Sequence, residues 1–182
     1  GAIDIDAIPL PSLHPERGYH RHPWVQRQAD FSDADAELGT DVRRRLALAS
    51  YYALVSFLDE QVGVVLRALA DSGQETSTRV IFTSDHGDNQ GARGMWNKST
   101  LYREATNIPL ILRGPDVPQG RACTTNCGLV DVAPTVLSAT GRHPTGDLPG
   151  RSLMDLASEP DDPQRIGFSE YHAVGSPSGA YM

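Results

Sequence analysis

The sequence predicts an α/β fold in which helices flank a layered sheet. Three observations support this class: helical periodicity over 41–70, short β-branched and aromatic runs at 79–83 and 108–112, and breaks rich in glycine and proline between the segments. Short, nearly continuous apolar strands separated by helices are typical of sheets that are covered by other layers. We therefore expect a sheet with helices packed on it.

Residues 1–39 are predicted to be an irregular segment that precedes the folded region at 40–182. Prolines and histidines are interspersed through it: Pro9, Pro11, His14, Pro15, His20, His22 and Pro23. A proline removes a backbone donor and restricts the residue before it. The closely spaced histidines raise a metal-site hypothesis, but no thiol or carboxylate accompanies them at ligand spacing. A surface loop is the favoured interpretation.

One long helix is predicted from Thr40 or Asp41, either of which can cap it, to about residue 70. Its apolar stripe has helical spacing: Val55, Leu58, Val62, Val65 and Leu69. Further apolar side chains on other sides of the helix, such as Phe57, predict a well-buried layer. Ser72-Gly73 ends the helix.

Shorter elements follow the helix. The expected order is a strand at 79–83, a helix at 101–105, a strand at 108–112 broken by Gly114-Pro115, a strand at 127–130, a helix capped by Asp131 and ended by Gly141, and a last strand at 166–170.

Composition argues against two classes of partner. The net charge is -7, and the only dense basic run, Arg43-Arg44-Arg45, lies at the predicted helix start, which favours a solvated helix face over nucleic-acid binding. No apolar run reaches the roughly 18 residues that span a bilayer. The sequence gives no indication of oligomeric state.

Two cysteines, Cys123 and Cys127, do not form a disulfide framework. The two thiols could pair or bind a metal, but no second Cys pair or suitable His pair stands near them. Two ordinary thiols are the favoured interpretation, and they favour a bacterial cytoplasm as the compartment.

Asp85 and His86 directly follow the strand at 79–83, at the end of a strand where ligands bind in open α/β sheets. A carboxylate oxygen and an imidazole nitrogen can together hold part of the shell of a divalent cation. Gly87 allows the backbone to turn sharply or to approach a ligand closely, and Asp88 could orient His86. The alternative is an ordinary turn, in which Ser, Asp and Gly are common.

Lys98 follows these residues behind Gly91 and Gly94. A lysine ammonium is a point charge suited to a tetrahedral oxyanion such as sulfate or phosphate. The alternative is a solvent-exposed lysine with no ligand.

Taken together, these segments resemble the sulfatase family. The matching runs are Phe57-Leu58-Asp59-Glu60-Gln61-Val62-Gly63, Phe82-Thr83-Ser84-Asp85-His86-Gly87-Asp88, Gly91-Ala92-Arg93-Gly94-Met95-Trp96-Asn97-Lys98, 101–115, 129–137 and Ser169-Glu170-Tyr171-His172. The resemblance covers residues from about 41 to 182. It implies an alkaline-phosphatase-like α/β sandwich and a hydrolase that acts on sulfate esters.

The resemblance also implies site residues and cofactors. Asp85 and His86 match metal ligands of the family, Lys98 matches its sulfate-contacting lysine, and His172 is a candidate near the substrate mouth. The implied metal is Ca²⁺, Mn²⁺ or Mg²⁺, and the implied nucleophile is a formylglycine made from Cys or Ser in a Cys/Ser-x-Pro-x-Arg motif. The Asp-His pair resembles the branch of choline-sulfatases and phosphonate monoester hydrolases.

This chain lacks the nucleophile motif, because neither cysteine nor Ser176-Pro177 fits it. We therefore expect the C-terminal part of a catalytic domain, an incomplete sheet and no turnover by the chain alone. Two alternatives remain: a phosphonate monoester hydrolase or phosphodiesterase of the same superfamily, and a non-catalytic module that binds an anion or a partner. For either enzyme the substrate is a small-molecule sulfate or phosphorus ester.

Overall fold

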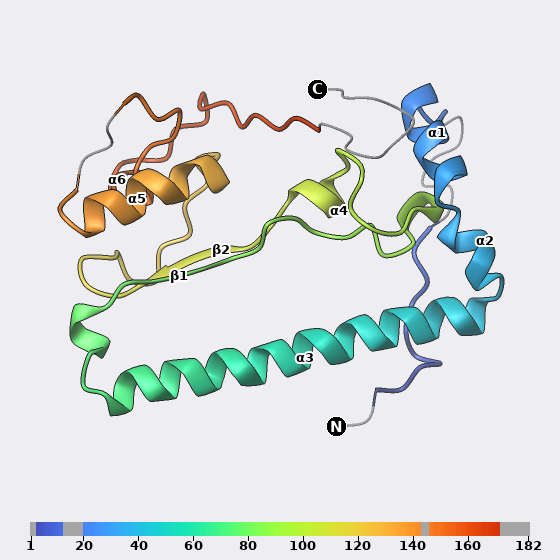
Figure 1. The fold of residues 1–182 in the computed structure, drawn as a ribbon, viewed down its shortest axis with the longest axis horizontal. Helices are drawn as coiled ribbons and strands as arrows, with labels where there is room; N and C mark the ends of the chain where they lie inside the picture. Colours follow the sequence, from blue (N-terminus) through green and yellow to red (C-terminus); the bar gives the residue numbers. More distant parts are fainter. Residues whose placement is uncertain (1–2, 13–19, 143–145, 172–182) are drawn as a thin grey trace. The chain divides into compact units, whose positions relative to one another are not determined.

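The computed structural model describes residues 3–12, 20–142 and 146–171 (Figure 1). The described residues form two compact units. The first draws on the described residues within 1–68, 86–108 and 169–182, and the second on those within 69–85 and 109–168. Both units are discontinuous in sequence, because segments of the first unit alternate along the chain with segments of the second.

The first unit begins with two short helices that sequence reasoning did not predict, α1 (Pro23–Phe31) and α2 (Ala34–Leu38). Pro23 occupies the first turn of α1, where a missing N–H costs nothing, and the His22 side chain accepts the N–H of Trp24. The Asp33 side chain caps α2 through the N–H of Ala36. The prediction of irregular chain over 1–39 is therefore wrong for 23–38, because the proline starts a helix there.

The long helix is confirmed as α3 (Asp41–Asp71). Thr40 Oγ1 accepts the N–H of Arg43 at its start, and Gly73, at φ +71°, lies just beyond its end. Its predicted burial is wrong for the described residues: only Leu48 and Ala49 are buried, whereas Val65 is 67% exposed. The stripe itself is present, and its residues Val55, Leu58 and Val65 are exposed.

The described residues include no helix that combines the length and the apolar character needed to cross a membrane.

Two small clusters form the core of the first unit. One joins Ile8 to Leu48 and Ala49 of α3. The other joins Trp24 and Val25 of α1 to Met95. The second cluster therefore ties α1 to the segment that carries the candidate anion-binding lysine. That segment includes the 3-10 turn η2 (Ala92–Gly94) and is followed by α4 (Arg103–Thr106), two residues later than the predicted helix.

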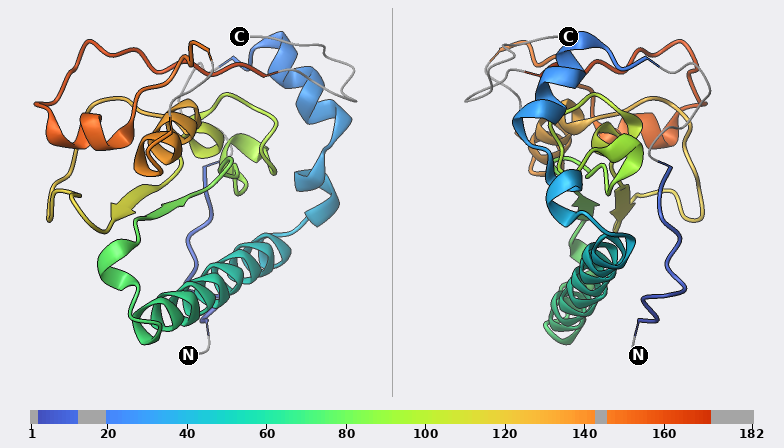
Figure 2. Two further views of the ribbon diagram at one scale, coloured as in Figure 1. Left: turned by 60° about the vertical axis from the view of Figure 1, so that its left-hand side comes forward. Right: turned by 90° about the vertical axis from the view of Figure 1, so that its right-hand side faces the viewer.

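The second unit contains the 3-10 turn η1 (Glu75–Ser77) and two strands, β1 (Val80–Thr83) and β2 (Leu110–Arg113), close to the predicted positions (Figure 2). The strands pair antiparallel, with Val80 opposite Arg113 and Thr83 opposite Leu110. Gly114 ends β2 at φ +130°, where an added Cβ would lie 2.5 Å from the carbonyl oxygen of Thr78. Only glycine fits this turn.

The remainder of the second unit is a 3-10 turn and two helices: η3 (Leu129–Asp131), α5 (Val132–Ala139) and α6 (Leu153–Ser158). The strand predicted at 127–130 is wrong, because η3 forms there. The strand predicted at 166–170 is also wrong, because none of these residues forms a strand and Ile166 is 86% exposed. Helix α6, capped by Ser152, was not predicted.

Asp131 does not cap α5 as expected but joins three segments of the second unit. Its carboxylate is fully buried and accepts the N–H groups of Gly128 and Arg151 and the guanidinium of Arg165, at 2.7 Å for the closest pair. We call Asp131, Gly128, Arg151 and Arg165 the Asp131 clamp. Burial by itself would raise the pKa of the carboxyl, but these hydrogen bonds outweigh it and hold the pKa below its usual value.

Candidate functional site

The candidate site residues follow β1 in sequence. Asp85 is exposed, and its Oδ1 accepts the hydroxyl of Ser84 at 3.4 Å. Asp85 is the last residue of a segment of the second unit, and His86 is the first residue of the next segment of the first unit. Residues 86–100, which we call the Lys98 loop, run from His86 to Thr100 within the first unit.

Within this loop the structure brings His86 and Lys98 together. Lys98 Nζ lies 2.7 Å from His86 Nε2, although the two residues are far apart along the loop. His86 Nδ1 lies 2.9 Å from the carbonyl oxygen of Gly87, which can only accept. The tautomer that donates from Nδ1 to this oxygen turns the lone pair of Nε2 toward Lys98 Nζ. A cation and an imidazole nitrogen that could bind a metal thus lie side by side.

Gly87 fixes the start of the loop against α4. Its N–H donates to the carbonyl oxygen of Ala105 at 2.8 Å. An added Cβ at Gly87 would lie 2.0 Å from the carbonyl oxygen of Glu104. Gly87 thus permits a close approach of backbone to backbone, with α4 as its partner, whereas its predicted approach to a ligand stays a prediction.

The middle of the loop is strained. Three residues other than glycine have positive φ: Gln90 at 50°, Arg93 at 58° and Asn97 at 67°. L-residues avoid this region because Cβ approaches the following carbonyl, at about 1 to 2 kcal/mol for each residue. Such conformations persist only where surrounding contacts impose them, and they cluster at functional sites.

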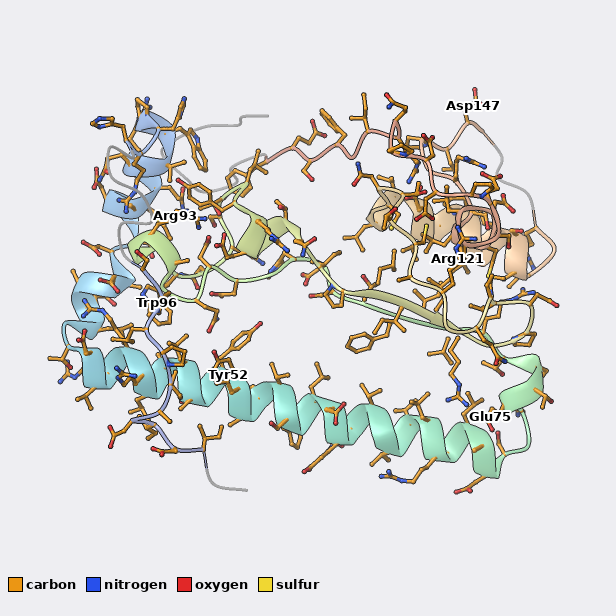
Figure 3. All side chains as sticks on the ribbon, turned by 180° about the vertical axis from the view of Figure 1, so that it is seen from behind. Tyr52, Glu75, Arg93, Trp96, Arg121 and Asp147 are labelled. Atoms are coloured by element: carbon orange, nitrogen blue, oxygen red, sulfur yellow. The ribbon has the colours of Figure 1, made fainter. Side chains whose placement is uncertain are left out.

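Arg93 supplies several of those contacts (Figure 3). Its guanidinium donates to Glu104 at 2.9 Å and stacks over the ring of Tyr102, 4.2 Å from the centroid. Its backbone N–H donates to Ser12, and its carbonyl accepts from Arg21 at 2.6 Å. The hydrogen bond from Arg93 lowers the pKa of the Glu104 carboxyl, so the pair stays ionised.

Trp96 provides a second anchor in the loop (Figure 3). Its indole N–H donates to Asp35 Oδ1 at 3.1 Å, and Asp35 also accepts two hydrogen bonds from Arg44 at 2.9 and 2.8 Å. The Arg44 guanidinium lowers the pKa of Asp35. The predicted solvated face at 43–45 is thus only partly correct, because Arg44 pairs with α2.

Asn89 forms the innermost network of the loop and was missed by sequence reasoning. It is 1% exposed. Its Nδ2 donates to the carbonyl oxygen of Asn97 at 2.6 Å, and its Oδ1 accepts the hydroxyl of Thr100 at 3.2 Å. No local signal distinguishes this asparagine from an ordinary turn residue, since its importance comes from burial.

The donor set suits a divalent metal only in part. Asp85 offers a hard oxygen and His86 an imidazole nitrogen. Over residues 3–12, 20–142 and 146–171, no group of three or more His, Cys, Asp or Glu side chains comes together to hold an ion. Asp88, proposed to orient His86, accepts the N–H of Gln90 instead. The described residues thus supply two donors suited to a metal.

Three other predicted residues have simpler outcomes. His172 lies outside the described residues. Cys123 and Cys127 are both exposed free thiols, consistent with the favoured interpretation.

The fold and the site together define the class of protein. Solved structures that resemble the chain include a phosphonate monoester hydrolase and a protein described as a putative sulfatase. The chain has part of their alkaline-phosphatase-like α/β fold. The family model described as Sulfatase matches residues 14–142, most of the chain and all of the Lys98 loop. The chain belongs to the sulfatase family.

Several relatives illustrate the range of the family. Arylsulfatase K of Danio rerio is 36% identical over 148 residues, which are 79% of this chain and 28% of that protein. Choline-sulfatase of Rhizobium meliloti is 30% identical and covers 76% of this chain and 25% of the relative. A phosphonate monoester hydrolase from Silicibacter pomeroyi superimposes with a TM-score of 0.79 at 29% identity, over 92% of this chain and 35% of that one. The chain thus spans about a third or less of the relatives that it matches.

Proposed function

We propose that this chain is the C-terminal part of the catalytic domain of a metal-dependent sulfatase that hydrolyses small-molecule sulfate esters. The observation that carries the proposal is the 2.7 Å approach of Lys98 Nζ to His86 Nε2 on a loop strained into place. Membership of the sulfatase family supports the reaction class.

Within this proposal each residue has a stated role. Asp85 and His86 would be two of the metal ligands, and His86 Nε2, which Lys98 contacts in this structure, would bind the metal once the ammonium turns to the anion. The metal would supply Lewis-acid stabilisation of charge at the nucleophile and the ester. Lys98 contacts a sulfate oxygen and offsets its negative charge. The formylglycine nucleophile and the other metal ligands belong to a segment that is not in this sequence.

The exposed apolar surface of α3 supports a longer protein. Val55, Leu58 and Val65 are 49%, 52% and 67% exposed. Phe57, on another side of the same helix, is 60% exposed. Soluble proteins rarely leave large contiguous apolar surfaces uncovered. We infer that further parts of the domain pack on this helix.

A second function is favoured by one specific observation. The phosphonate monoester hydrolase superimposes on 92% of the chain with a TM-score of 0.79. A cation and a metal that hold a sulfate oxygen would also hold a phosphonate oxygen, since both are tetrahedral oxyanions. Substrate choice within the superfamily is therefore a separate question from the reaction class.

The test uses the whole protein that contains this chain, produced together with a formylglycine-generating enzyme. Initial rates are measured on an aryl sulfate, an aryl phosphonate and a phosphate diester, with Mn²⁺, with Ca²⁺ and after chelation. Asp85→Ala and His86→Ala test the metal ligands, and Arg103→Ala, which removes an exposed cation of the same unit, is the matched control.

The expected result is metal-dependent sulfate release that Asp85→Ala and His86→Ala abolish and Arg103→Ala preserves. Faster hydrolysis of the phosphorus esters would assign the protein to the second function. Full activity after chelation, or with both ligands replaced, would contradict the metal role. A fully modified protein without activity on any ester would overturn both enzyme functions and favour a non-catalytic module.

A further inference from the structure

Asn89 is placed to control the backbone on which Lys98 sits. Two donors from this one residue reach the same acceptor: its backbone N–H and its side-chain Nδ2 lie 2.9 and 2.6 Å from the carbonyl oxygen of Asn97. That carbonyl belongs to the peptide group that joins Asn97 to Lys98. The orientation of this peptide group is therefore set by Asn89.

The peptide group on the other side of Lys98 is fixed as well. The carbonyl oxygen of Lys98 accepts the N–H of Thr100 at 2.6 Å. The Thr100 hydroxyl in turn donates to Asn89 Oδ1 at 3.2 Å, and both side chains are buried. The amide of Asn89 thus closes a ring of hydrogen bonds around the lysine backbone.

The hydrogen-bonded ring includes Asn97, which has a left-handed backbone conformation. Asn97 has φ +67°, a conformation that is unfavourable unless other contacts impose it. The two hydrogen bonds from Asn89 are contacts of that kind. The exposed ammonium of Lys98 ends a flexible stem, so the position of its backbone determines which region the charge can reach.

We propose that Asn89 is a positioning residue for Lys98: its buried amide fixes the peptide groups on both sides of the lysine and so aims the ammonium at the anion. The proposal rests on the anion role of Lys98 proposed above. Asn89 does not touch the anion and acts through Lys98 alone. Removal of the Asn89 amide is therefore expected to lower kcat/KM by about 10- to 100-fold, as for other residues that orient a ligand-binding group.

The test is a double-mutant cycle in the whole enzyme. Asn89→Leu keeps the branched heavy-atom shape of the side chain and removes its two side-chain hydrogen bonds, to Asn97 and from Thr100, whereas the backbone N–H bond to Asn97 remains. It is made in the wild-type background and in Lys98→Ala, together with Thr100→Val and the conservative Thr100→Ser, which keeps the hydroxyl. Rates on the best ester give kcat and KM, and the affinity for inorganic sulfate is measured by calorimetry.

If the proposal is right, Asn89→Leu lowers kcat/KM and sulfate affinity in the wild-type background, and adds less than about 2-fold to the loss in Lys98→Ala. Thr100→Ser retains activity that Thr100→Val loses. An equal loss in both backgrounds would show a merely structural role and overturn the proposal, as would an unchanged sulfate affinity.

Folding is controlled by the double variant Asn89→Leu/Thr100→Val. Replacing both partners of a buried hydrogen bond by apolar groups can restore stability that one replacement loses. Recovered stability with activity still low would support positioning, whereas recovered activity would overturn it. A wild-type enzyme that hydrolyses no ester would contradict the proposed function, and sulfate affinity across the same cycle would still decide whether Asn89 acts through Lys98.

Discussion

The Lys98 loop and the Asp131 clamp differ in the exposure of the charged group that each contains. In the loop, the ammonium of Lys98 is exposed, and the backbone around it is strained at Gln90, Arg93 and Asn97. In the clamp, the carboxylate of Asp131 has no exposed surface, and both of its oxygens accept hydrogen bonds.

The difference separates the proposed anion-binding ammonium of Lys98 from the structural carboxylate of Asp131. A buried charge is tolerated when every one of its hydrogen bonds is made, and it then joins segments of chain. An exposed charge on an otherwise fixed backbone contributes little to folding and keeps its capacity for a ligand. Replacement of Lys98 should therefore affect activity, and replacement of Asp131 should affect stability.

The largest expected effect is on catalysis. Lys98→Ala should lower kcat of the whole enzyme by about 100- to 1,000-fold, because a donor to the developing negative charge is lost. Its stability should change by less than about 0.5 kcal/mol, since the side chain is exposed. Initial rates and urea unfolding measure the two quantities. A stability loss as large as that of an Asp131 variant would erase the contrast between the two regions.

Asp131→Asn should give the opposite result. Loss of the buried charge opposite Arg165 is expected to lower the free energy of unfolding by about 3 kcal/mol, measured by urea denaturation. Asp147→Asn, at an exposed carboxylate (Figure 3), is the control and should have almost no effect. Equal stability of the two variants would show that the clamp does not stabilise the fold.

The clamp also predicts a pH dependence. The folded pKa of Asp131 lies below its ordinary value of 3.8, so the unfolded chain binds the proton more readily than the folded chain. The stabilisation is fully present above that ordinary value and is lost as the pH falls through the folded pKa. Urea unfolding between neutral and acidic pH should show the difference between wild type and Asp131→Asn shrinking in acid. A constant difference would contradict the lowered pKa.

Gly87→Ala tests the close approach of the loop to α4. A Cβ at 2.0 Å from the carbonyl oxygen of Glu104 forces the backbone to move, at an expected cost of about 2 kcal/mol together with a loss of activity. Gly128→Ala is the matched control, because nothing lies within 4 Å of its added Cβ. Thermal unfolding and initial rates are compared; similar behaviour of both variants would mean that the approach is not required.

The smallest effect is expected at Asn97. With φ +67°, Asn97→Ala should lose about 1 kcal/mol in thermal unfolding, and Asn97→Gly should lose nothing, because glycine adopts this conformation freely. If alanine is tolerated as well as glycine, the loop is not strained at this position.

The sequence by itself predicted the long helix at 41–70, the strands at 79–83 and 108–112, and the family, and the structure places these elements at 41–71, 80–83 and 110–113. Those elements have local causes: the capping by Thr40, the β-branched runs and the stop at Gly114 act within a few residues. The position of Asp85 and His86 just beyond a strand was also predictable, because it depends on their order in the chain.

Only the tertiary structure decided the rest. Asn89 looks like a turn residue until burial and the two contacts to Asn97 and Thr100 are known. The sequence position of Asp131 is that of a helix cap, but in the structure its buried carboxylate accepts a hydrogen bond from Arg165, which is distant in sequence. A sequence pattern shows which residues are close along the chain. The energetic contribution of a polar group depends on its burial and on its hydrogen-bond partners, and folding can bring those partners from distant parts of the sequence.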